Sequence, residues 1–409
     1  MSRLTDRGGV RSTGTAPRTA SNLHRVHEER VFRAAHPVAY PLLCRIRVPV
    51  LRVPGVGVVV RDTRLIRRVL LDGDTFDKTG PGSPADLWTP ILGPSVLLNM
   101  EGADHASLRR KLAPLFTPSA VAHLADAGLA PLLADAVRRL RGGETVDVVA
   151  LARSCASRLI AELAGLPQDT LDDELFARIT RITGMVRLTS SRFSPRQVGA
   201  ARSILADLTT GAATAYRAGD ESTVPGRMRQ LGLSEREALG AVGAFVLTGT
   251  ETLVAFIPRL VAILVDSGWF ERLRAELELR DELVQEGLRV TTPSPVMLRS
   301  VRGPSTLGDV AVRRGDRLVL ANFLANRGPG DFAPGRGRAA GQKQLWFGAG
   351  PHFCLGAPLA LAQIARVLDA LVEGTADGPA EVTARRPARG VLIPGYRELL
   401  LRRADGARP

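Results

Sequence analysis

A lone cysteine near the C-terminus, Cys354, lies inside the glycine-rich stretch 347–356, whose sequence is FGAGPHFCLG. Glycine has no side chain, so its backbone can approach a bulky neighbour closely. The next segment, residues 357–373, is rich in Ala and Leu and predicts a helix, with Pro358 in the first turn, where proline is tolerated. Cys354 would then lie at a helix N-terminus, whose free N–H groups and positive dipole end stabilise a thiolate. The pattern predicts a sulfur anion presented to a large, flat metal cofactor.

Three other chemistries are open to Cys354. A buried cysteine is often no more than a small hydrophobic residue. A nucleophilic cysteine needs a base, and His352 is only two residues away, a spacing at which side chains rarely face each other. Zinc needs several ligands at short spacings, whereas Cys44 and Cys155 are distant in the sequence. A single thiolate that leaves the opposite face of the metal open is the haem-thiolate arrangement, which the pattern favours.

A second candidate for chemistry is the polar stretch 248–252 (TGTET), inside the apolar run 238–265. Glycine, threonine and a carboxylate lower the helix propensity there, so their presence needs a reason. Thr248 and Thr252 fall on one helix face, and together with Glu251 they could hydrogen-bond dioxygen and relay protons. The sequence leaves an alternative open, in which the threonine hydroxyls bond to backbone carbonyls and only bend the helix.

Three further groups are weak signals when they are taken singly. Glu286 and Arg289 form a pair at a spacing that many surface ion pairs share. His105 and Arg109 fall on one helix face, where they could clamp carboxylates or simply be solvated. The extended segment 294–299 has apolar residues that could line a pocket, and it ends in an arginine that could hold an anion.

These motifs, in this order, resemble the cytochrome P-450 family of haem-thiolate monooxygenases over nearly the full length of the chain. The cysteine stretch matches the family pattern Phe-Gly-x-Gly-x-His-x-Cys-x-Gly, which is the most specific part of the likeness. The resemblance implies that Cys354 is the axial ligand of the haem iron and that Glu286 and Arg289 brace the proximal side. It also implies oxygen activation by Glu251 and Thr252. The remaining haem-binding residues that it implies are Phe347, Gly348 and Gly356 in the loop and His105, Arg109, Arg299 and His352 at the propionates.

The resemblance further implies an activity. The expected reaction inserts one oxygen atom from dioxygen into an apolar small molecule, by hydroxylation or epoxidation, in the tailoring of a secondary metabolite. Haem b is the expected cofactor, and electrons are expected from NAD(P)H through a ferredoxin reductase and a ferredoxin. By the same likeness, the residues expected in the substrate pocket are Trp88, Ala244, Phe245, Thr248, Val296, Met297 and Ile393.

Other functions remain alternatives at this stage. The same site could be driven by peroxide, or could catalyse oxidative coupling or desaturation, although the Glu251–Thr252 pair argues against the peroxide-driven enzyme. A catalytically idle haem protein that recruits partners belongs to a different class.

The chain also departs from the family pattern. The tract 326–344 is compressed, which leaves open whether Arg336 or Arg338 completes the network of Glu286 and Arg289. Thr248 stands where the family usually has Ala or Gly, and Gly287 is a poor helix former.

The composition limits the partners of the protein. The formal net charge is +14, but nearly all basic residues are arginine, with lysine only at Lys78, Lys111 and Lys343. Aromatic residues make up 4% of the chain, too few for base-stacking platforms, so we expect no nucleic-acid partner. A basic surface that steers an acidic ferredoxin is expected instead, and its candidate residues are Arg109, Arg110, Lys111, Arg338 and Lys343.

The remaining features concern location and organisation. Three widely spaced cysteines favour a reducing compartment, and residues 1–22 contain no apolar run, so we expect a flexible tail, no membrane contact and a cytoplasmic monomer. Residues 23–409 are expected to form one cytochrome P-450 domain, mainly α with small β-sheets (α+β). Alternating apolar residues in 45–60 predict a hairpin, and residues 62–289 are mostly helical in pattern. Ser234 and Glu237 form a capping box that opens the long central helix, and the resemblance places the haem between that helix and the helix after Cys354.

Overall fold

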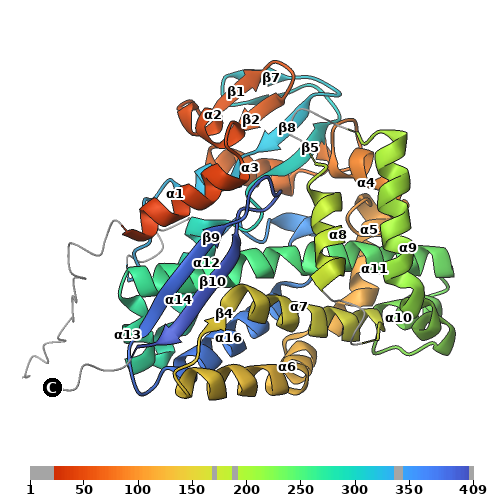
Figure 1. Ribbon diagram of the computed structural model, residues 1–409. Helices are drawn as coiled ribbons and strands as arrows, with labels where there is room; N and C mark the ends of the chain where they lie inside the picture. The colour runs from red at the N-terminus through yellow and green to blue at the C-terminus, as the bar shows by residue number, and fades with distance from the viewer. Residues whose placement is uncertain (1–22, 168–172, 187–191, 336–343, 405–409) are drawn as a thin grey trace, which may run out of the picture.

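The computed structural model describes residues 23–167, 173–186, 192–335 and 344–404 (Figure 1). Most of the described chain is helical, with one small sheet at the top of Figure 1 and another running down its left-hand side. The mainly helical architecture with small sheets that the sequence predicts is confirmed. The predicted tail and Arg336, Arg338 and Lys343 lie outside the described residues.

The upper sheet contains the hairpin predicted from residues 45–60. Strands β1 (Val50–Val53) and β2 (Gly57–Val60) pair antiparallel, and β2 continues the sheet by pairing parallel with β8 (Arg317–Leu320). β8 pairs antiparallel with β5 (Met297–Val301), which pairs with β3 (Phe76–Asp77). Arg299 of β5 and the chain that follows β3 are therefore neighbours, although they are far apart in sequence.

Two smaller sheets complete the β structure of the described residues. Strand β10 (Tyr396–Arg403) lies between β4 (Val146–Asp147) and β9 (Ala380–Pro387), and β6 (Ser305–Leu307) pairs with β7 (Val310–Val312). The turn between β9 and β10 carries Leu392 and Ile393 toward the centre of the molecule, where both line the main cavity.

The described α-helices follow the amphipathic segments of the sequence. Their bounds are α1 Leu23–Ala35, α2 Ala39–Arg45, α3 Thr63–Leu71, α4 Pro84–Leu92, α5 Gly102–Leu112, α6 Pro118–Arg141, α7 Val148–Ala164, α8 Asp173–Thr183, α9 Pro195–Ala218, α10 Val224–Gln230, α11 Glu235–Gly249, α12 Glu251–Asp266, α13 Trp269–Ala275, α14 Arg280–Thr291, α15 Asn322–Arg327 and α16 Ala357–Gly374. The helix predicted after Cys354 is α16, with a proline in its first turn as expected.

The long central helix of the prediction is present as two helices, α11 and α12, which meet at Thr250. Its predicted start is confirmed, because Ser234 and Glu237 form the reciprocal hydrogen bonds of a capping box. A Cβ atom at Gly249 would lie 2.6 Å from Cδ1 of Ile160 in α7, so a larger residue would force that side chain to shift where the two helices approach closely. The stretch 248–252 therefore lies at a helix junction rather than in the middle of one helix.

Helix α12 forms the centre of the core and packs against α7, α14 and α16. Its Ile257, Leu260 and Ile263 are buried, and burial of each such side chain contributes about 1.5–3 kcal/mol of hydrophobic free energy. Gly287 of α14 faces Leu260, and any Cβ atom at Gly287 would collide with that side chain. This poor helix former thus allows α14 to pack closely on α12.

A buried ion pair joins the N-terminal helix α1 to α12. Arg259 is fully buried, and its guanidinium donates to both carboxylate oxygens of Glu28, with Nε 3.0 Å from Oε1. Its Nη1 donates to the carbonyl of Pro394 at 3.1 Å. The same arginine therefore also anchors the turn that carries Ile393.

We expect Glu28→Ala to lower the free energy of unfolding by about 3–5 kcal/mol, because the buried Arg259 would lose its counter-charge. Glu29→Ala is the matched control, since Glu29 pairs with Arg33 on the surface and its loss should cost less than about 1 kcal/mol. Denaturant unfolding of the two variants measures the difference. Equal, small changes would show that the buried pair does not hold α1 on α12.

Two helical stretches, Pro118–Arg141 and Glu235–Asp266, are long and apolar enough to cross a membrane by length and composition alone. In the second, 56% of the most apolar window is buried inside the fold. Core helices pass the same test, so the finding is weak evidence for a membrane span.

Candidate active site

A cavity of about 580 Å³ is lined by both the Cys354 loop and the α11–α12 junction. The residues predicted for the substrate pocket all reach it: Trp88, Ala244, Phe245, Thr248, Val296, Met297 and Ile393. The residues predicted for haem binding and oxygen activation that also line it are Cys354, Phe347, Gly356, His105, Arg109, Arg299, His352, Glu251 and Thr252. The structure thus brings together, in one mostly apolar cavity, residues that are widely separated in sequence.

The Cys354 loop is folded back on itself before α16 begins. The backbone N–H of Cys354 donates to the carbonyl of Phe347 at 2.9 Å. Gly348 and Gly350 have φ values of +75° and +69°, in the left-handed region that favours glycine. A Cβ atom at Gly350 would also lie 2.7 Å from the carbonyl oxygen of Leu70. Gly348 is not among the residues that line the cavity, so its contribution in this structure is to the turn of the loop.

The Cys354 side chain is exposed into the cavity but surrounded by protein. Burial raises the pKa of its thiol, and hydrogen bonds from the backbone of Gly356 and Ala357 and the charge of Arg109 lower it in part. The helix N-terminus therefore lowers the pKa of the thiol, as predicted, but burial raises this pKa by more. A metal cation would supply the additional stabilisation that a thiolate needs here.

A cluster of cationic side chains lines the same cavity, and the sequence analysis found only part of it. Lys78, which follows β3, is 8% exposed and Arg299 is 4% exposed, while Arg109 is half-buried. The pKa of Lys78 is lowered to about 7, mainly by burial and also by the positive charges of Arg299 and Arg109. Burial likewise lowers the pKa of Arg299 to about 10. Like charges are therefore crowded together in a poorly solvated place.

Glu101 is the carboxylate that faces this cluster. Its Oε1 lies 2.7 Å from Nε2 of His352, and its Oε2 accepts from the backbone N–H of Lys78 at 3.0 Å. Burial raises the pKa of Glu101, but the hydrogen bond and charge of His352 outweigh it with the help of Lys78, so the net pKa is lowered. The His105 and His352 rings lie 4.1 Å apart, and burial is the main cause that lowers the pKa of His105 to about 4.

These charges test whether the cavity fits a haem. None of the three cations of this cluster forms an ion pair with another described residue, and the carboxylates that act on them are Glu101 and Asp77. The cavity therefore offers unpaired cationic donors to an anionic group. Trp346 Nε1, in the same lining, is also buried without a hydrogen-bond partner among the described residues. The donors present therefore fit a flat, anionic cofactor beside a cysteine ligand.

Sequence analysis missed Lys78 and Glu101. The available signal was the rarity of lysine: in a chain where almost every basic residue is arginine, Lys78 is one of three lysines. The rarity of lysine in this chain marks Lys78 as a candidate functional residue. Glu101 gave no signal of its own, because its two partners, Lys78 and His352, lie on other segments of the chain.

The residues predicted to act on oxygen lie at the α11–α12 junction. Thr248 Oγ1 donates to the carbonyl of Ala244 at 2.7 Å, and Thr252 Oγ1 donates to the carbonyl of Thr248 at 3.2 Å. The back-bonding that the sequence left open is thus observed. Glu251 is different, because its Oε1 accepts from Thr183 Oγ1 of α8 at 3.0 Å. Burial raises the pKa of Glu251, although hydrogen bonds from threonines of α8 lower it in part.

The Glu286–Arg289 pair forms on α14 as predicted, with Nη2 of the arginine 2.6 Å from Oε1 of the glutamate. The arginine also donates to three backbone carbonyls, that of Asn326 in α15 and those of Gly330 and Asp331 after it. The glutamate accepts from the backbone N–H of Ala333 at 2.9 Å. The pair therefore holds the tract of chain that leads toward Cys354. Within the described residues, backbone carbonyl and N–H groups complete the network of the pair.

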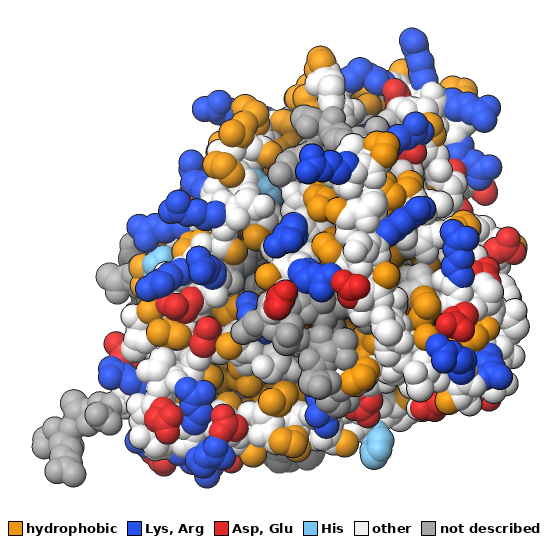
Figure 2. Space-filling model, turned by 45° about the vertical axis from the view of Figure 1, so that its right-hand side comes forward, with side chains coloured by type: hydrophobic (Ala, Val, Ile, Leu, Met, Phe, Trp, Pro, Cys, Tyr) orange, Lys and Arg blue, Asp and Glu red, His pale blue; other side chains and the backbone are white. Residues whose placement is uncertain are grey.

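The predicted docking residues divide into two groups. Arg109 lines the cavity, whereas Arg110 and Lys111 of the same helix, α5, are exposed. On the face drawn in Figure 2, Lys and Arg side chains are spread over the surface rather than gathered into one patch.

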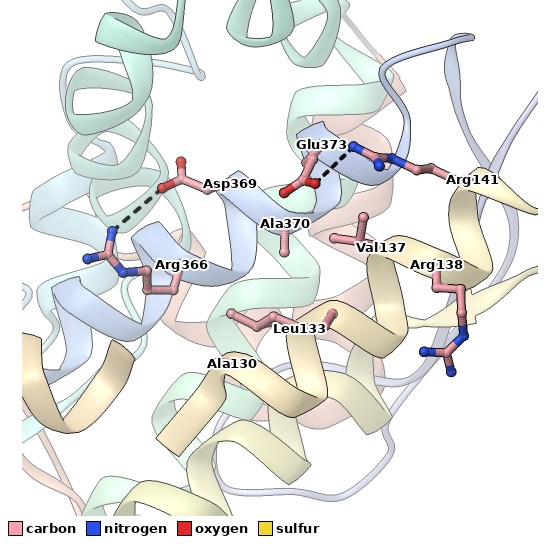
Figure 3. A pocket seen from close by; sticks show the side chains of 10 residues that line it. Ala130, Leu133, Val137, Arg138, Arg141, Arg366, Asp369, Ala370 and Glu373 are labelled. Atoms are coloured by element: carbon pink, nitrogen blue, oxygen red, sulfur yellow. Dashed lines mark hydrogen bonds and ion pairs between the residues drawn. The ribbon is translucent and has the colours of Figure 1, made fainter. Parts of the chain in front are cut away.

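A second hollow lies between α6 and α16 (Figure 3). Its floor includes the small apolar side chains of Ala130 and Ala370, and two pairs of its charged residues interact, Arg141 with Glu373 at 2.9 Å and Arg366 with Asp369. It presents no cysteine and no unpaired buried cation. Among the described residues, no group of three or more His, Cys, Asp or Glu side chains could hold a metal ion.

Comparison with known proteins agrees with the geometry. No family model matches the sequence. The chain is 28% identical over 358 residues to the mycinamicin IV hydroxylase/epoxidase of Micromonospora griseorubida, an alignment that covers 82% of this chain and 86% of that protein. It is 26% identical over 344 residues to cytochrome P-450(BM-1) of Priestia megaterium, covering 75% and 79%. A solved structure of a mutant of P-450 EryK in complex with erythromycin B superposes with a TM-score of 0.75 at 22% identity, covering 92% of this chain and 99% of that chain.

The solved structure shows the fold. The two relatives are named as a hydroxylase/epoxidase and as a cytochrome P-450. Together with a cysteine exposed to a cavity rimmed by cations, they define a haem-thiolate oxygenase. The chain belongs to the cytochrome P-450 family and is a monooxygenase of that family.

Proposed function

We propose that this monooxygenase inserts one oxygen atom from dioxygen into an apolar small molecule of secondary metabolism, with Cys354 as the axial ligand of haem b. The observation that carries the proposal is a cysteine open to a mostly apolar cavity whose buried cations have no ion-pair partner among the described residues. The hydroxylase/epoxidase activity named for the mycinamicin relative supports hydroxylation or epoxidation as the reaction. It does not identify the compound.

When bound, the haem would supply the activation of dioxygen, which electron donation from a thiolate favours. The residues of the chain would bind the haem, orient the substrate and deliver protons. Arg109 and Arg299 would hold the propionates, because each guanidinium has donors to spare and lies in the cavity lining. The apolar walls, among them Phe245 and Met297, would exclude water and accept an apolar substrate.

Proton delivery is proposed for Glu251 and Thr252. Because its pKa is raised, Glu251 keeps its proton to a higher pH than a solvated carboxyl does, and the bond from Thr183 fixes one of its oxygens. The 3.2 Å bond from Thr252 to the Thr248 carbonyl is long for a hydroxyl donor. This hydroxyl would therefore turn from its backbone acceptor toward the cavity at small cost.

The absorption spectrum of the reduced, carbon-monoxide-bound protein tests the proposal. A thiolate-ligated haem gives a strongly red-shifted Soret band, and we expect that band from the wild-type protein. Its absence from well-loaded protein would overturn the assignment of Cys354. Spectral shifts on titration with a library of apolar natural products would then narrow the substrate.

We also propose that electrons come from NAD(P)H through a ferredoxin reductase and a ferredoxin, with the protein acting as a cytoplasmic monomer. Arg110 and Lys111 are the docking residues that the structure leaves exposed. If docking is electrostatic, raising the ionic strength from about 0.05 to 0.5 M should slow ferredoxin-driven reduction about tenfold. Reduction by dithionite is the control, because it needs no docked partner. A ferredoxin rate that is independent of salt would contradict electrostatic docking.

Measurements of turnover and of NAD(P)H consumption separate two rival functions. Turnover with hydrogen peroxide alone, at the rate of the reconstituted electron chain, would favour a peroxide-driven enzyme. Full haem loading without NAD(P)H consumption, whichever ferredoxin is supplied, would favour an idle recruitment protein. The raised pKa of Glu251 supports the monooxygenase, since a proton donor is of use in dioxygen activation.

A further inference from the structure

Both ring nitrogens of His352 are engaged by the protein. Nε2 lies 2.7 Å from Oε1 of Glu101, and Nδ1 lies 3.5 Å from Nζ of Lys78. The contact with Glu101 orients the ring, so that Nδ1 faces the ammonium group of Lys78. His352 and Lys78 therefore lie side by side in the lining of the cavity.

Lys78 is held so that its ammonium group lies at the cavity. Its backbone N–H donates to Oε2 of Glu101 at 3.0 Å, and its carbonyl accepts from the backbone N–H of Ala85 at 3.0 Å and from Ser83 Oγ. The ammonium itself has one weak contact, with His352 at 3.5 Å, and lies in the lining of the cavity. Two of its three donors therefore have no partner among the described residues.

The carboxylate next to Lys78 does not satisfy these donors. Both oxygens of Glu101 are occupied, one by His352 and the other by the Lys78 backbone, and no ion pair forms between the Lys78 ammonium and a described carboxylate. The other charged groups around it, Arg299 and Arg109, are cations. A buried ammonium among cations needs an anion that the chain itself does not provide.

We propose that Lys78 contacts a haem propionate on this side of the cavity, in addition to the residues that the family resemblance implied. This inference rests on the proposed function, because it requires a haem in the cavity. Lys78 is absent from the haem-binding set that the family resemblance implied.

The rate of haem transfer from the loaded protein to excess apomyoglobin tests the proposal. Loss of a charge-assisted hydrogen bond should speed transfer from Lys78→Met about tenfold or more. Lys78→Arg keeps the charge and should transfer haem at close to the wild-type rate. Lys111→Met, on the surface of α5, is the matched control and should not differ from wild type.

A neutral form of the cofactor separates a direct contact from a structural effect. In iron protoporphyrin IX dimethyl ester the propionates are uncharged, so wild type and Lys78→Met should release it at the same rate. An unchanged rate for Lys78→Met with natural haem would overturn the proposal. A tenfold effect that persists with the ester would also overturn it, because Lys78 would then act through the fold. Failure of the proposed function itself would appear elsewhere, as wild-type protein without the red-shifted Soret band.

Discussion

Cys354→Ser is expected to abolish the red-shifted Soret band of the reduced, carbon-monoxide-bound protein and to reduce turnover to background. A serine hydroxyl does not ionise near neutral pH, so it cannot replace the electron-donating thiolate. The loop should still fold. Serine is nearly isosteric with cysteine, and the backbone N–H groups of Gly356 and Ala357 that point to the sulfur can donate to an oxygen instead.

Cys44→Ser is the matched control for this experiment. Cys44 lies on α2, is partly buried and does not line the cavity, so the band should survive its replacement. Thermal unfolding of both variants shows whether they are folded. A Cys354→Ser protein that retains the band would mean that another residue supplies the thiolate.

Glu251→Gln is expected to lower turnover about 10²- to 10⁴-fold, the usual contribution of a positioned acid or base. Glutamine keeps the shape of the side chain and can still accept the hydrogen bond from Thr183, but it cannot deliver a proton. Haem content and substrate affinity should therefore change little. Glu235→Gln, in the first turn of α11, is the control and should keep wild-type turnover, because the Glu235 side chain is partly exposed and does not line the cavity. Equal turnover of Glu251→Gln and wild type would exclude Glu251 from proton delivery.

The pH dependence of this effect has a definite sign. Burial raises the pKa of Glu251, so the carboxyl keeps its proton above the pH at which a solvated glutamic acid loses it. The proton is lost as the pH rises through the raised pKa, and turnover that depends on it should fall in the same range. The Glu251→Gln variant has no titrating group there. Its pH profile should lack this descending limb if Glu251 is the donor.

Local sequence signals predicted the elements that position the site. The capping box of Ser234 and Glu237 marked the start of α11, because its hydrogen bonds join residues three apart. The alternating residues around Pro54 and Gly55 predicted the β1–β2 hairpin for the same reason. The helix after Cys354 was predicted from its composition and from Pro358. In each case the deciding interactions lie within one short segment.

Features that depend on distant segments were not predictable in this way. The close approach of Ile160 to Gly249 at the α11–α12 break involves a side chain of another helix, so no pattern in residues 238–265 reveals it. The pKa of Cys354 depends on burial by the whole fold, and burial outweighs the helix N-terminus that the sequence did identify. Lys78 and Glu101 became candidates only when tertiary structure brought them to His352.

The contact between Lys78 and His352 joins two points of the chain that are 274 residues apart in sequence. A ribosome delivers the first of these residues long before the second, and domains generally fold as units once their segments are available. The walls that would enclose the cofactor are therefore assembled only near the end of translation. A cofactor that contacts both segments can therefore be fully enclosed only after most of the chain has been synthesised.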